Sequence, residues 1–384
     1  MKQGWEIKKL GEVCSLIADG DWIESRHQSE DGIRLIQTGN IGNGVFKAKD
    51  DKPHYISEST FAELGCTEIF AGDCLVSRLP DPVGRACIVP ELNCRMITAV
   101  DCSIIRFNGG IAPSFFIYYT QSEQYKRDID NNTTGTTRKR ISRKNLESTS
   151  IPVPPLPEQE KIVEELDCLS GIIEKKREQL KELDALAESI FYTMFGDPIT
   201  NEKGWEVNTI GNLAEFYNGV AHEGSISEYG QYDVVNSKFI STQGDVRKHC
   251  DLQMFPLLKN DIVMVMSDVP NGKALAKCYL IESDNKYTLN QRICAFRNYN
   301  NFNPIFLYYY LNRHPYYLRF DDGNGQTNLR RNDVLNCPVY IPHTHLQQEF
   351  ADKITLIEKQ KQLIKESIAQ TEELFNSRMS YYFD

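Results

Sequence analysis

The sequence predicts an α+β protein in which two copies of one globular module are each followed by a long amphipathic helix. The first observation is a repeat with a spacing of about 190 to 200 residues: GWEIKKLGEV at 4–13 returns as GWEVNTIGNL at 204–213. The second is that each copy alternates short β-branched and aromatic runs with Gly, Asn and Asp turns. A chain built this way is expected to have an approximate internal two-fold axis and to recognise two binding targets, one with each module, at a fixed separation.

Three further segments recur in the same order. They are AGDCLVSRLPDPVGRACIV (71–89) with KNDIVMVMSDVPNGKALAKCYLI (259–281), SFFIYYT (114–120) with IFLYYYL (305–311), and VPPLPEQEKIV (153–163) with IPHTHLQQEFADKI (341–354). Strands are expected at IRLIQTGNI, GDCLVSR, RACIVP and CSIIRF in the first copy, and at YDVVNSKFI, DIVMVM, KCYLI and RICAFR in the second. Many short strands with turns between them predict a curved mixed sheet with a few helices. The expected divisions are a first module over 1–155, a helix over 156–197, a second module over 198–343 and a helix over 344–384.

Both helices carry apolar residues in a heptad pattern. In the first helix these are Ile162, Leu166, Leu169, Ile173, Leu180, Leu183, Ala187, Ile190 and Met194, with an interruption at Lys176. In the second they are Phe350, Ile354, Ile357, Ile364, Ile368 and Phe375, with interruptions at Lys361 and Thr371. Two such stripes predict a long antiparallel intramolecular coiled coil, and at 1.5 Å per residue the first helix would be roughly 55 Å long. The alternative is that each helix packs only on its own module; the length, the charged flanks and the repetition favour paired helices.

Composition places the chain among ordinary globular proteins, with 41% hydrophobic and 25% charged residues. No apolar run is long enough to cross a bilayer, and the segment MKQGWEIKKL is too polar for a signal peptide. The eleven cysteines form no Cys-x-x-Cys pair, and several of them, including Cys74 and Cys278, lie inside apolar runs. This usage predicts buried, reduced thiols in a cytoplasmic protein, without a disulfide framework or a zinc site.

The net charge of −10 would argue against nucleic acid if it were spread evenly. It is not, because ten acidic residues and only five basic ones lie between Glu158 and Glu188. A basic run, Arg138, Lys139, Arg140, Arg143 and Lys144, falls within seven residues. Since a partner responds to the local field, a mildly acidic chain can still present a basic face.

The order of these features resembles the specificity (S) subunits of type I restriction–modification systems, along the whole chain. The motifs that carry the resemblance are the openings at Trp5 and Trp205, a turn with Ser77, Arg78, Gly84 and Arg85, the stretch GTTRKRIS at 135–142, and the helix entry LPEQEKI at 156–162. The second copy departs from this pattern: Asp268 is aligned with Arg78, and GNGQTNLRR at 323–331 replaces GTTRKRIS.

The resemblance implies a non-catalytic DNA-binding protein of a restriction system. Each module would be a target-recognition domain that contacts one half of a bipartite double-stranded DNA target, and the paired helices would set the gap between the halves. The helices would also dock methyltransferase (M) subunits, two in number, and endonuclease/translocase (R) subunits would join through them. No cofactor is expected on this chain, because S-adenosylmethionine and ATP would belong to the partner subunits; no membrane partner is expected.

Motifs for chemistry are weak or missing. NPIF at 303–306 is similar to the Asn-Pro-Pro-Phe/Tyr motif of amino-methyltransferases, but its counterpart APSF at 112–115 could not hold an exocyclic amine. Asn303 is therefore predicted to be a helix N-cap with Pro304 at the first helical position. The sequence has neither a Phe-x-Gly-x-Gly loop nor a phosphate loop of the G-x-x-x-x-G-K-[ST] type. His343 and His345 have no third ligand in view, so surface or packing roles are favoured over metal binding. No catalytic and no metal-binding residue is predicted.

Residues for DNA contact are predicted from their chemistry. The basic run and the preceding Thr136 and Thr137 are favoured as phosphate contacts over an ordinary solvated face, with Arg330 and Arg331 as their partners in the second copy. Arg forks suit guanine and Asn or Gln amides suit adenine. The base-reading candidates on turns are Gln37, Thr38, Asn40, Arg78 and Arg85 in the first copy and Asn236, Lys238, Lys273, Asn290, Gln291 and Arg292 in the second. Each of them could instead be a solvated turn residue or a strand cap. Trp22 is expected in the core rather than as a base-stacking wedge.

Two other functions stay open from the sequence. One is a DNA methyltransferase-type enzyme with its own recognition domains, which the missing cofactor loop disfavours. The other is a coiled-coil adaptor whose repeated modules bind proteins. Binding of S-adenosylmethionine to the isolated chain would distinguish the first, and salt-dependent DNA binding would argue against the second.

Overall fold

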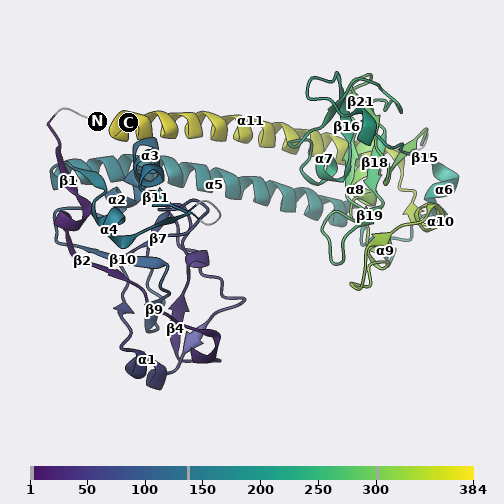
Figure 1. Ribbon diagram of the computed structural model, residues 1–384. Helices are drawn as coiled ribbons and strands as arrows, with labels where there is room; N and C mark the ends of the chain where they lie inside the picture. The colour runs from purple at the N-terminus through teal and green to yellow at the C-terminus, as the bar shows by residue number, and fades with distance from the viewer. Residues whose placement is uncertain (1–3, 136–138, 300–301) are drawn as a thin grey trace. The chain divides into compact units, whose positions relative to one another are not determined.

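The computed structural model describes residues 4–135, 139–299 and 302–384. Its contacts divide the chain into two compact units: unit 1 comprises Met1–Arg177 and Glu366–Asp384, and unit 2 comprises Glu178–Lys365. The helices α5 (Leu156–Phe195) and α11 (Thr344–Phe383) each contribute one part to unit 1 and the other part to unit 2 (Figure 1). Each unit therefore contains one globular module together with segments of both long helices.

Unit 1 is built on an antiparallel sheet of four strands. Its order is β2 (Cys14–Asp19), β10 (Cys102–Phe107), β7 (Cys74–Ser77) and β8 (Ala86–Ile88). A second sheet has the order β3 (Gln28–Ser29), β5 (Tyr55–Ile56), β4 (Ile33–Ile36), β9 (Met96–Thr98) and β6 (Glu68–Ile69), and β4 and β9 run parallel. Two short pairs complete the unit: β1 (Glu6–Lys9) with β13 (Ser150–Val153), and β11 (Thr133–Thr134) with β12 (Arg140–Ile141).

Unit 2 repeats this arrangement. Its four-stranded sheet has the order β15 (Glu215–Asn218), β22 (Ile293–Arg297), β18 (Ile262–Val265) and β20 (Cys278–Leu280). The second sheet has the order β17 (His249–Cys250), β16 (Tyr232–Val235) and β21 (Tyr287–Leu289), and β16 and β21 run parallel. The short pairs are β14 (Val207–Thr209) with β24 (Pro338–Tyr340), and β19 (Ser267–Asp268) with β23 (Thr327–Asn328). The α+β class is as predicted, but the strands form separate sheets rather than a single curved one.

Short helices cover these sheets. In unit 1 they are α1 (Glu58–Leu64), α2 (Pro113–Tyr119), α3 (Glu123–Asn131) and α4 (Arg143–Glu147), with 3₁₀ turns η1 (Leu10–Val13), η2 (Ser25–His27) and η3 (Thr38–Asn40). In unit 2 they are α6 (Ile210–Leu213), α7 (Ser237–Ser241), α8 (Pro304–Leu311), α9 (Pro315–Leu318) and α10 (Arg331–Leu335), with the turn η4 (Glu223–Ser225). Helix α8 starts as predicted: the Asn303 side chain accepts the Ile305 N–H, and Pro304 occupies the first turn.

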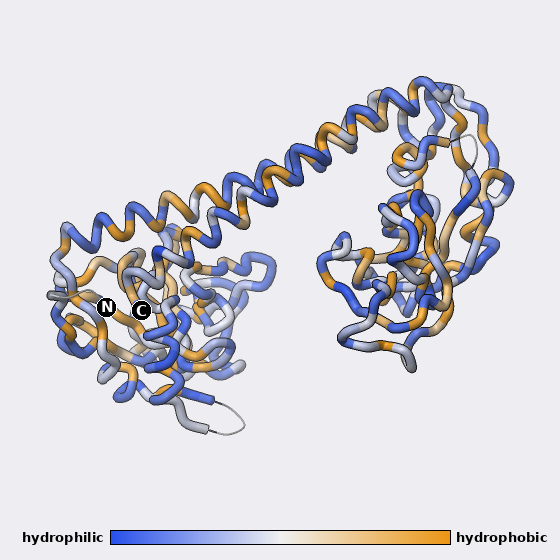
Figure 2. The backbone as a smooth tube through the Cα atoms, turned by 90° about the horizontal axis from the view of Figure 1, so that it is seen from above, coloured by the Kyte–Doolittle hydropathy of each residue, from blue (hydrophilic) through white to orange (hydrophobic). Residues whose placement is uncertain are grey.

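The long helices alternate polar and apolar residues along their length (Figure 2). Their apolar heptad residues are buried or partly buried within each unit. In unit 1, Ile162 and Leu166 of α5 join the module's core together with Met379, Tyr382 and Phe383 of α11. In unit 2, Phe191 of α5 packs on Phe350 of α11, with ring centroids 5.6 Å apart. The helices therefore pack on the modules and on each other, so that both alternatives from the sequence hold in part.

Polar contacts show that the two helices run antiparallel within each unit. In unit 1, Lys176 donates to Ser367 Oγ at 2.6 Å, and Arg378 Nη2 donates to Glu165 Oε2 at 2.9 Å. In unit 2, Lys361 lies 2.7 Å from Asp184 Oδ1. The lysines that interrupt the heptads thus have partners on the opposite helix. The predicted helix-pairing residues are all buried or partly buried: Ile162, Leu166, Leu169, Ile173, Leu180, Leu183, Ile190, Ile354, Ile357, Ile364 and Ile368.

One glutamine attaches the first turn of each long helix to its module. Gln159 is fully buried: its Oε1 accepts the Ala112 N–H at 2.8 Å, and its Nε2 donates to the carbonyls of Gly110 and Pro154. Gln347 of α11 does the same with the Asn303 N–H at 2.9 Å and the Pro342 carbonyl at 2.8 Å. These bonds fix the position at which each helix leaves its module.

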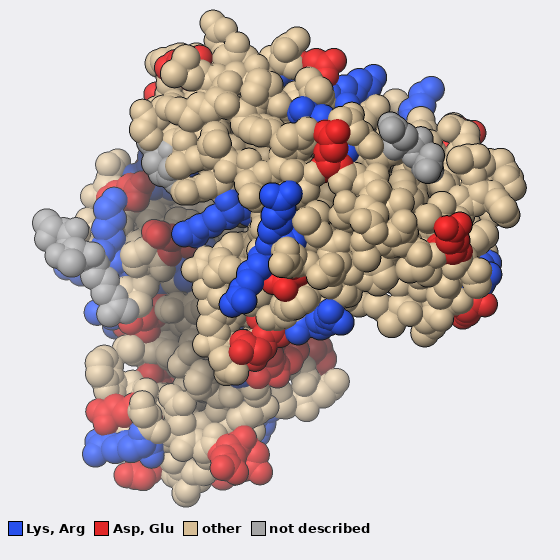
Figure 3. All heavy atoms as spheres, turned by 90° about the vertical axis from the view of Figure 1, so that its right-hand side faces the viewer, with Lys and Arg blue, Asp and Glu red and all other residues tan. Residues whose placement is uncertain are grey.

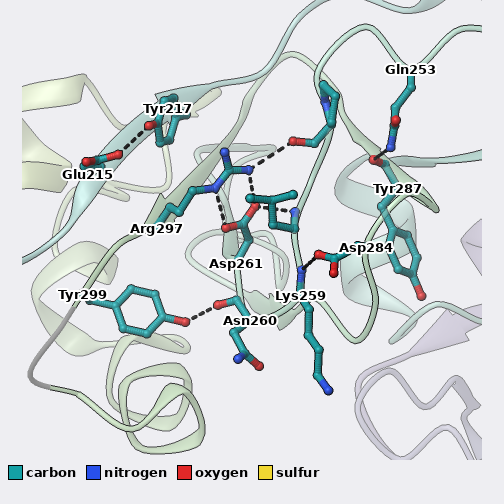
Figure 4. A network of polar contacts seen from close by, with 12 residues as sticks. Glu215, Tyr217, Gln253, Lys259, Asn260, Asp261, Asp284, Tyr287, Arg297 and Tyr299 are labelled. Carbon is teal, nitrogen blue, oxygen red and sulfur yellow. Dashed lines mark hydrogen bonds and ion pairs between the residues drawn. The ribbon is translucent and has the colours of Figure 1, made fainter.

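An arginine–aspartate pair, with a buried carboxylate and a partly buried guanidinium, fixes the four-stranded sheet of each unit. In unit 2, Arg297 donates through Nε and Nη2 to the two carboxylate oxygens of Asp261, at 2.8 and 2.6 Å (Figure 4). In unit 1, Arg106 binds Asp73 with the same two-pronged geometry, at 2.7 and 2.8 Å. The carboxylate is the main cause that raises the pKa of each guanidinium, so both pairs stay charged.

A glycine in each unit allows two backbones to approach. A Cβ on Gly20 would lie 2.3 Å from the Ala99 carbonyl oxygen, and one on Gly219 would lie 1.9 Å from the Asn290 carbonyl oxygen. Both glycines follow the first strand of the four-stranded sheet, where the chain passes to the second sheet. The modules thus share a steric requirement as well as their polar contacts.

Candidate nucleic-acid interface

In unit 1, Arg85 joins the two loops that carry the predicted base-reading residues. Its guanidinium donates to the carbonyls of Thr38 (2.9 Å) and Ile41 (2.7 Å) in one loop, and of Leu79 (2.8 Å) and Pro82 (2.9 Å) in the other. Burial lowers the pKa of this guanidinium, partly offset by nearby acidic groups. The structure therefore brings these loops together, and Arg85 acts by positioning them.

Asn40 also folds the first of these loops. It is buried, its Oδ1 accepts the Gln37 N–H at 2.9 Å, and its Nδ2 donates to the Lys47 carbonyl at 2.9 Å. Gln37 and Thr38 are only half-buried at the start of the same loop. Of the loop candidates, these two have side chains in reach of a ligand.

Arg78 faces into unit 1. Only 4% of its surface is exposed, its Nη1 lies 3.1 Å from Asp19 Oδ1, and its Nη2 donates to the Val100 carbonyl at 2.6 Å. Burial lowers the pKa of Arg78, and the charge of Asp19 partly offsets this. In the adjacent strand β12, where the Ile141 N–H donates to the Arg78 carbonyl, Arg140 forms an ion pair with Asp101 at 2.8 Å. The charges of Arg78 and Arg140 are thus balanced by carboxylates within the module.

The basic run is only partly described, because Thr136, Thr137 and Arg138 lie outside the described residues. Lys139, Arg140, Arg143 and Lys144 are all exposed, at β12 and in the first turn of α4. Ser142 caps α4 by accepting the Asn145 N–H at 3.1 Å. Arg143 also contacts Glu147 within α4 at 3.3 Å. Lys139 and Lys144 form no ion pair with a described residue, so their charges face solvent.

The matching helix α10 of unit 2 carries Arg330 at its N-cap and Arg331 in its first turn. Both are exposed, and the guanidinium of Arg331 lies over the Phe216 ring at 5.3 Å from its centroid. On the face of unit 2 turned to the viewer in Figure 3, basic side chains are interspersed with acidic and uncharged ones. Arg330 and Arg331 therefore lie on a face of mixed charge in unit 2, whereas the cations of unit 1 follow one another in a short run.

The remaining candidates of unit 2 have different environments. Asn236 caps α7 by accepting the Phe239 N–H at 2.9 Å, whereas Lys238 and Lys273 are exposed. Asn290 and Gln291 are half-buried beside the exposed Arg292, whose φ of 65° is in the left-handed region. Three of these candidates are therefore exposed cations: Lys238 in α7, and Lys273 and Arg292 in turns.

Strand registers correct the alignment of the second copy. The N–H of Arg78 donates to Asp101 O, and Arg78 O accepts from Ile141; Met266 makes the same two bonds with Arg292 and Leu329. Met266 therefore occupies the position of Arg78, and the alignment of Asp268 with Arg78 was wrong. The error arose because the turn that follows is longer in unit 2.

Two contacts that hold the loops of unit 2 were missed for the same reason. Lys277 occupies the position of Arg85, and its Nζ donates to the Ser241 carbonyl at the end of α7 at 3.3 Å. Asp268 closes the longer turn by accepting the N–H groups of Val269, Ala274 and Leu275. The segment Asp-Val-Pro-Asn-Gly at 268–272 is rich in turn-forming residues, and it could have predicted that Asp268 accepts N–H groups across a turn.

Trp22 also differs from expectation. It was predicted to be in the core, but 69% of its surface is exposed, and its Nε1 donates to Glu24 Oε1 at 3.3 Å.

His343 and His345 stack at 5.7 Å between ring centroids, and His343 packs against Trp205. In the described part of the chain, no group of three or more His, Cys, Asp or Glu has the geometry of a metal site. Nor does any helix there have the length and hydrophobicity that crossing a bilayer requires.

Comparison with known proteins identifies the family. A family model described as the type I restriction modification DNA specificity domain matches residues 2–184 and again residues 202–373. The chain belongs to this family. Each match covers one copy of the repeat, so both modules are specificity domains by descent.

Relatives agree with this assignment. The chain is 22% identical over 197 residues to the MjaVIII specificity subunit of Methanocaldococcus jannaschii, an alignment covering 49% of this chain and 44% of the relative. It is 22% identical over 208 residues to the EcoKI specificity subunit of Escherichia coli, covering 53% and 44%. These alignments span less than half the length of the curated relatives. A chain from a structure on complex assembly in a type I R-M system shares the fold, with a TM-score of 0.61 and 17% identity over 100% of this chain and 98% of that chain.

Proposed function

We propose that this chain is the DNA-recognition subunit of a type I restriction–modification enzyme. The observation that carries the proposal is the family match to both copies of the repeat, at 2–184 and 202–373. The modules over 1–155 and 198–343 each bind one half of a bipartite DNA target. The helices over 156–197 and 344–384 pair, set the unread gap and dock two methyltransferase subunits, through which endonuclease subunits join.

In this proposal the chain itself is not an enzyme. S-adenosylmethionine and ATP bind the partner subunits, and this chain supplies sequence recognition and spacing. The expected cytoplasmic location is part of the same proposal, since the partners act on genomic DNA.

Exposed cations on the loops support DNA contact. Lys139 and Lys144 of unit 1 and Arg330 of unit 2 lie at or beside the start of equivalent helices, without an ion pair to a described residue. Such cations neutralise phosphates and release counterions, which supplies affinity but no sequence information. The loops fixed by Arg85 and by Asp268 are rigid enough to hold base-contacting side chains in one geometry.

The decisive experiment is methylation by purified components. The chain alone should neither methylate DNA nor hydrolyse ATP, and it should bind DNA weakly. Addition of its modification subunit should produce adenine methylation at a bipartite sequence, mapped by single-molecule sequencing of the DNA methylated in the reaction. Methylation by the chain alone would refute the proposal and favour a methyltransferase.

The basic run provides a second test. Replacing Arg138, Lys139, Arg140, Arg143 and Lys144 together with Ala should weaken DNA binding of the complex and flatten its salt dependence, with the methylated sequence unchanged. The control replaces Lys203, Lys248 and Lys286, exposed cations that lie outside the basic run and outside both long helices. Equal binding by the basic-run variant and wild type would remove these residues from the interface.

The spacing role is tested in the helices. Deleting a heptad from α5 should change the gap between the half-sites and leave both half-site sequences unaltered. A charged residue in place of Leu180 or Leu183 should uncouple the modules, because an unpaired charge in an apolar seam costs several kcal/mol. Normal methylation of the original target by these variants would exclude a spacing role.

A further inference from the structure

One edge of unit 2 differs chemically from the same edge of unit 1. In unit 1 it holds the two ion pairs already described, Arg78 with Asp19 and Arg140 with Asp101. The backbone registers place Met266, Asn218, Asn328 and Arg292 at these four positions in unit 2, in the same order. Four charges that cancel in unit 1 are thus replaced by two amides, one methionine and one arginine.

Three polar side chains are joined at this edge of unit 2. Gln326 Nε2 donates to Ser267 Oγ at 2.8 Å, and Ser267 Oγ donates to Asn328 Oδ1 at 2.6 Å. Only 9% of Ser267 is exposed, whereas both amides are exposed to solvent. Because Ser267 is bonded on both sides, it fixes the orientation of the two amides relative to each other.

Each amide keeps hydrogen-bonding capacity for a ligand. Gln326 retains its Oε1 and one N–H, and Asn328 retains a lone pair on Oδ1 and one N–H, its other N–H being directed at the Gln326 carbonyl at 3.4 Å. A donor next to an acceptor matches the adenine edge, which presents an N6 amino group beside N7. Guanine presents two acceptors there and cytosine one donor, so neither matches as well.

The loops that carry these amides are held in place from within unit 2. Thr327 Oγ1 donates to Asp321 Oδ1 at 3.1 Å, and the same oxygen accepts the Gly323 N–H at 3.1 Å. Asp268 closes the neighbouring turn, where Gly272 leaves room: a Cβ there would lie 2.1 Å from Asp268 Oδ2. A site on such loops needs little reorganisation to bind.

The amides line a hollow of about 490 Å³. Its other walls are Phe320, Asp322, Asn324, Gly325, Thr327, Arg330 and Asp333. The carboxylate of Asp333 already accepts a hydrogen bond within α10, from the Arg330 N–H at 2.8 Å. Arg330 at the hollow and Arg292 in the turn before β22 are exposed and form no ion pair with a described residue, so both are available to phosphates.

Resting on the proposed DNA recognition, we propose that the Gln326–Ser267–Asn328 chain reads an adenine in the half-site bound by unit 2. The two amides contact the base edge, Ser267 positions them, and Arg292 and Arg330 hold the flanking backbone. Unit 1 has ion pairs at the matched positions, so it reads its half-site with other residues, and the two half-sites differ.

The test uses the complete complex of this chain with its modification subunit, expressed in a host whose methylated motif is mapped by single-molecule sequencing. Gln326→Ala and Asn328→Ala should each relax one adenine position in a single half-site, lowering discrimination there by roughly ten- to a hundredfold. The other half-site should be unchanged. Asn212→Ala, which removes an exposed amide of α6 that donates to Asn208, is the matched control and should leave both halves intact.

Gln326→Glu is a second variant. Because glutamate and glutamine have the same size, it leaves no cavity that could destabilise the fold. A carboxylate only accepts, so the preference at that position should move from adenine towards cytosine. An unchanged motif in all three variants overturns this inference and leaves the proposed function standing. A wild-type complex that methylates no bipartite sequence overturns the proposed function itself, so the two failures are distinguishable.

Discussion

The same turn is closed by opposite charges in the two units. In unit 1 the guanidinium of Arg85 donates to carbonyls on both sides of a short turn. In unit 2 the carboxylate of Asp268 accepts N–H groups from a longer turn. The difference teaches that the requirement at this position is a closed turn rather than a particular residue, which leaves the exposed surface free to differ.

Other contacts are the same in both units. The Arg106–Asp73 and Arg297–Asp261 pairs and the two glutamines at the helix starts keep the same pattern of hydrogen bonds. Each unit is therefore a constant frame that carries variable loops, and the frame and the loops can be tested separately.

The largest effect is expected from breaking the frame. Asp261→Ala leaves the Arg297 guanidinium and the Leu258 N–H without their acceptor and should lower the free energy of unfolding of unit 2 by about 3–5 kcal/mol. Asp73→Ala should cost less, because Arg106 is more exposed than Arg297 (30% against 21%) and water can solvate it. Urea unfolding followed by Trp205 fluorescence, with Trp5 and Trp22 replaced by Phe, reports on unit 2.

Asp284→Ala serves as control for that experiment, since Asp284 is exposed and accepts one N–H from Lys259 (Figure 4). It should cost less than about 1 kcal/mol. Equal losses for Asp284 and Asp261 would mean that the buried pair does not stabilise the frame.

Acid should destabilise unit 2 more than unit 1. The two buried histidines among the described residues, His222 and His314, both belong to unit 2. Burial lowers the pKa of His314 from 6.5 to about 4, although the Pro198 carbonyl and Asp197 partly oppose this. The unfolded chain then binds a proton that the folded one excludes, so unit 2 should lose up to about 3 kcal/mol as pH falls from 6.5 towards 4.

Stability curves at several pH values, read from Trp205 for unit 2 and from Trp5 for unit 1, would measure this. His314→Asn should remove most of the added acid sensitivity, whereas His345→Asn, at an exposed histidine, should not change it. A parallel decline of both units down to pH 4 would show that His314 is not its source.

The helix starts should respond equally. Gln159→Leu and Gln347→Leu each leave a buried N–H and carbonyls without a partner and should cost about 2 kcal/mol in the unit concerned. Gln348→Leu, one residue away and exposed, is the control and should cost less than about 1 kcal/mol. Thermal unfolding measures all three. A loss in one unit only would show that the frame is not equivalent.

The elements of the frame could be predicted from the sequence, whereas its Arg–Asp pairs, its helix-start glutamines and the loops could not. The repeat, the strands and the heptads follow from periodicity, which the core enforces, and the Asn303 cap follows from local chemistry. Which loop side chains face a ligand depends on tertiary contacts. Arg78 and Asn40 have suitable chemistry but are used internally. Asp268 was misaligned because turn lengths differ, and Gln326 and Asn328 gain their significance only beside Ser267.

The smallest effect concerns a difference between the long helices. Gly171 of α5 lies twelve residues after Gln159, and Lys359 of α11 lies twelve residues after Gln347. A Cβ on Gly171 would meet nothing within 4 Å, so Gly171→Ala should stabilise unit 1 by about 1 kcal/mol, by restricting the unfolded chain. The reciprocal Lys359→Gly should destabilise unit 2 by a similar amount. Unfolding followed by Trp5 and by Trp205 measures each change. Opposite and nearly equal shifts would mean that the two helices differ here in propensity alone, whereas a loss from Gly171→Ala would mean that α5 needs the flexibility of glycine at this position and is not interchangeable with α11.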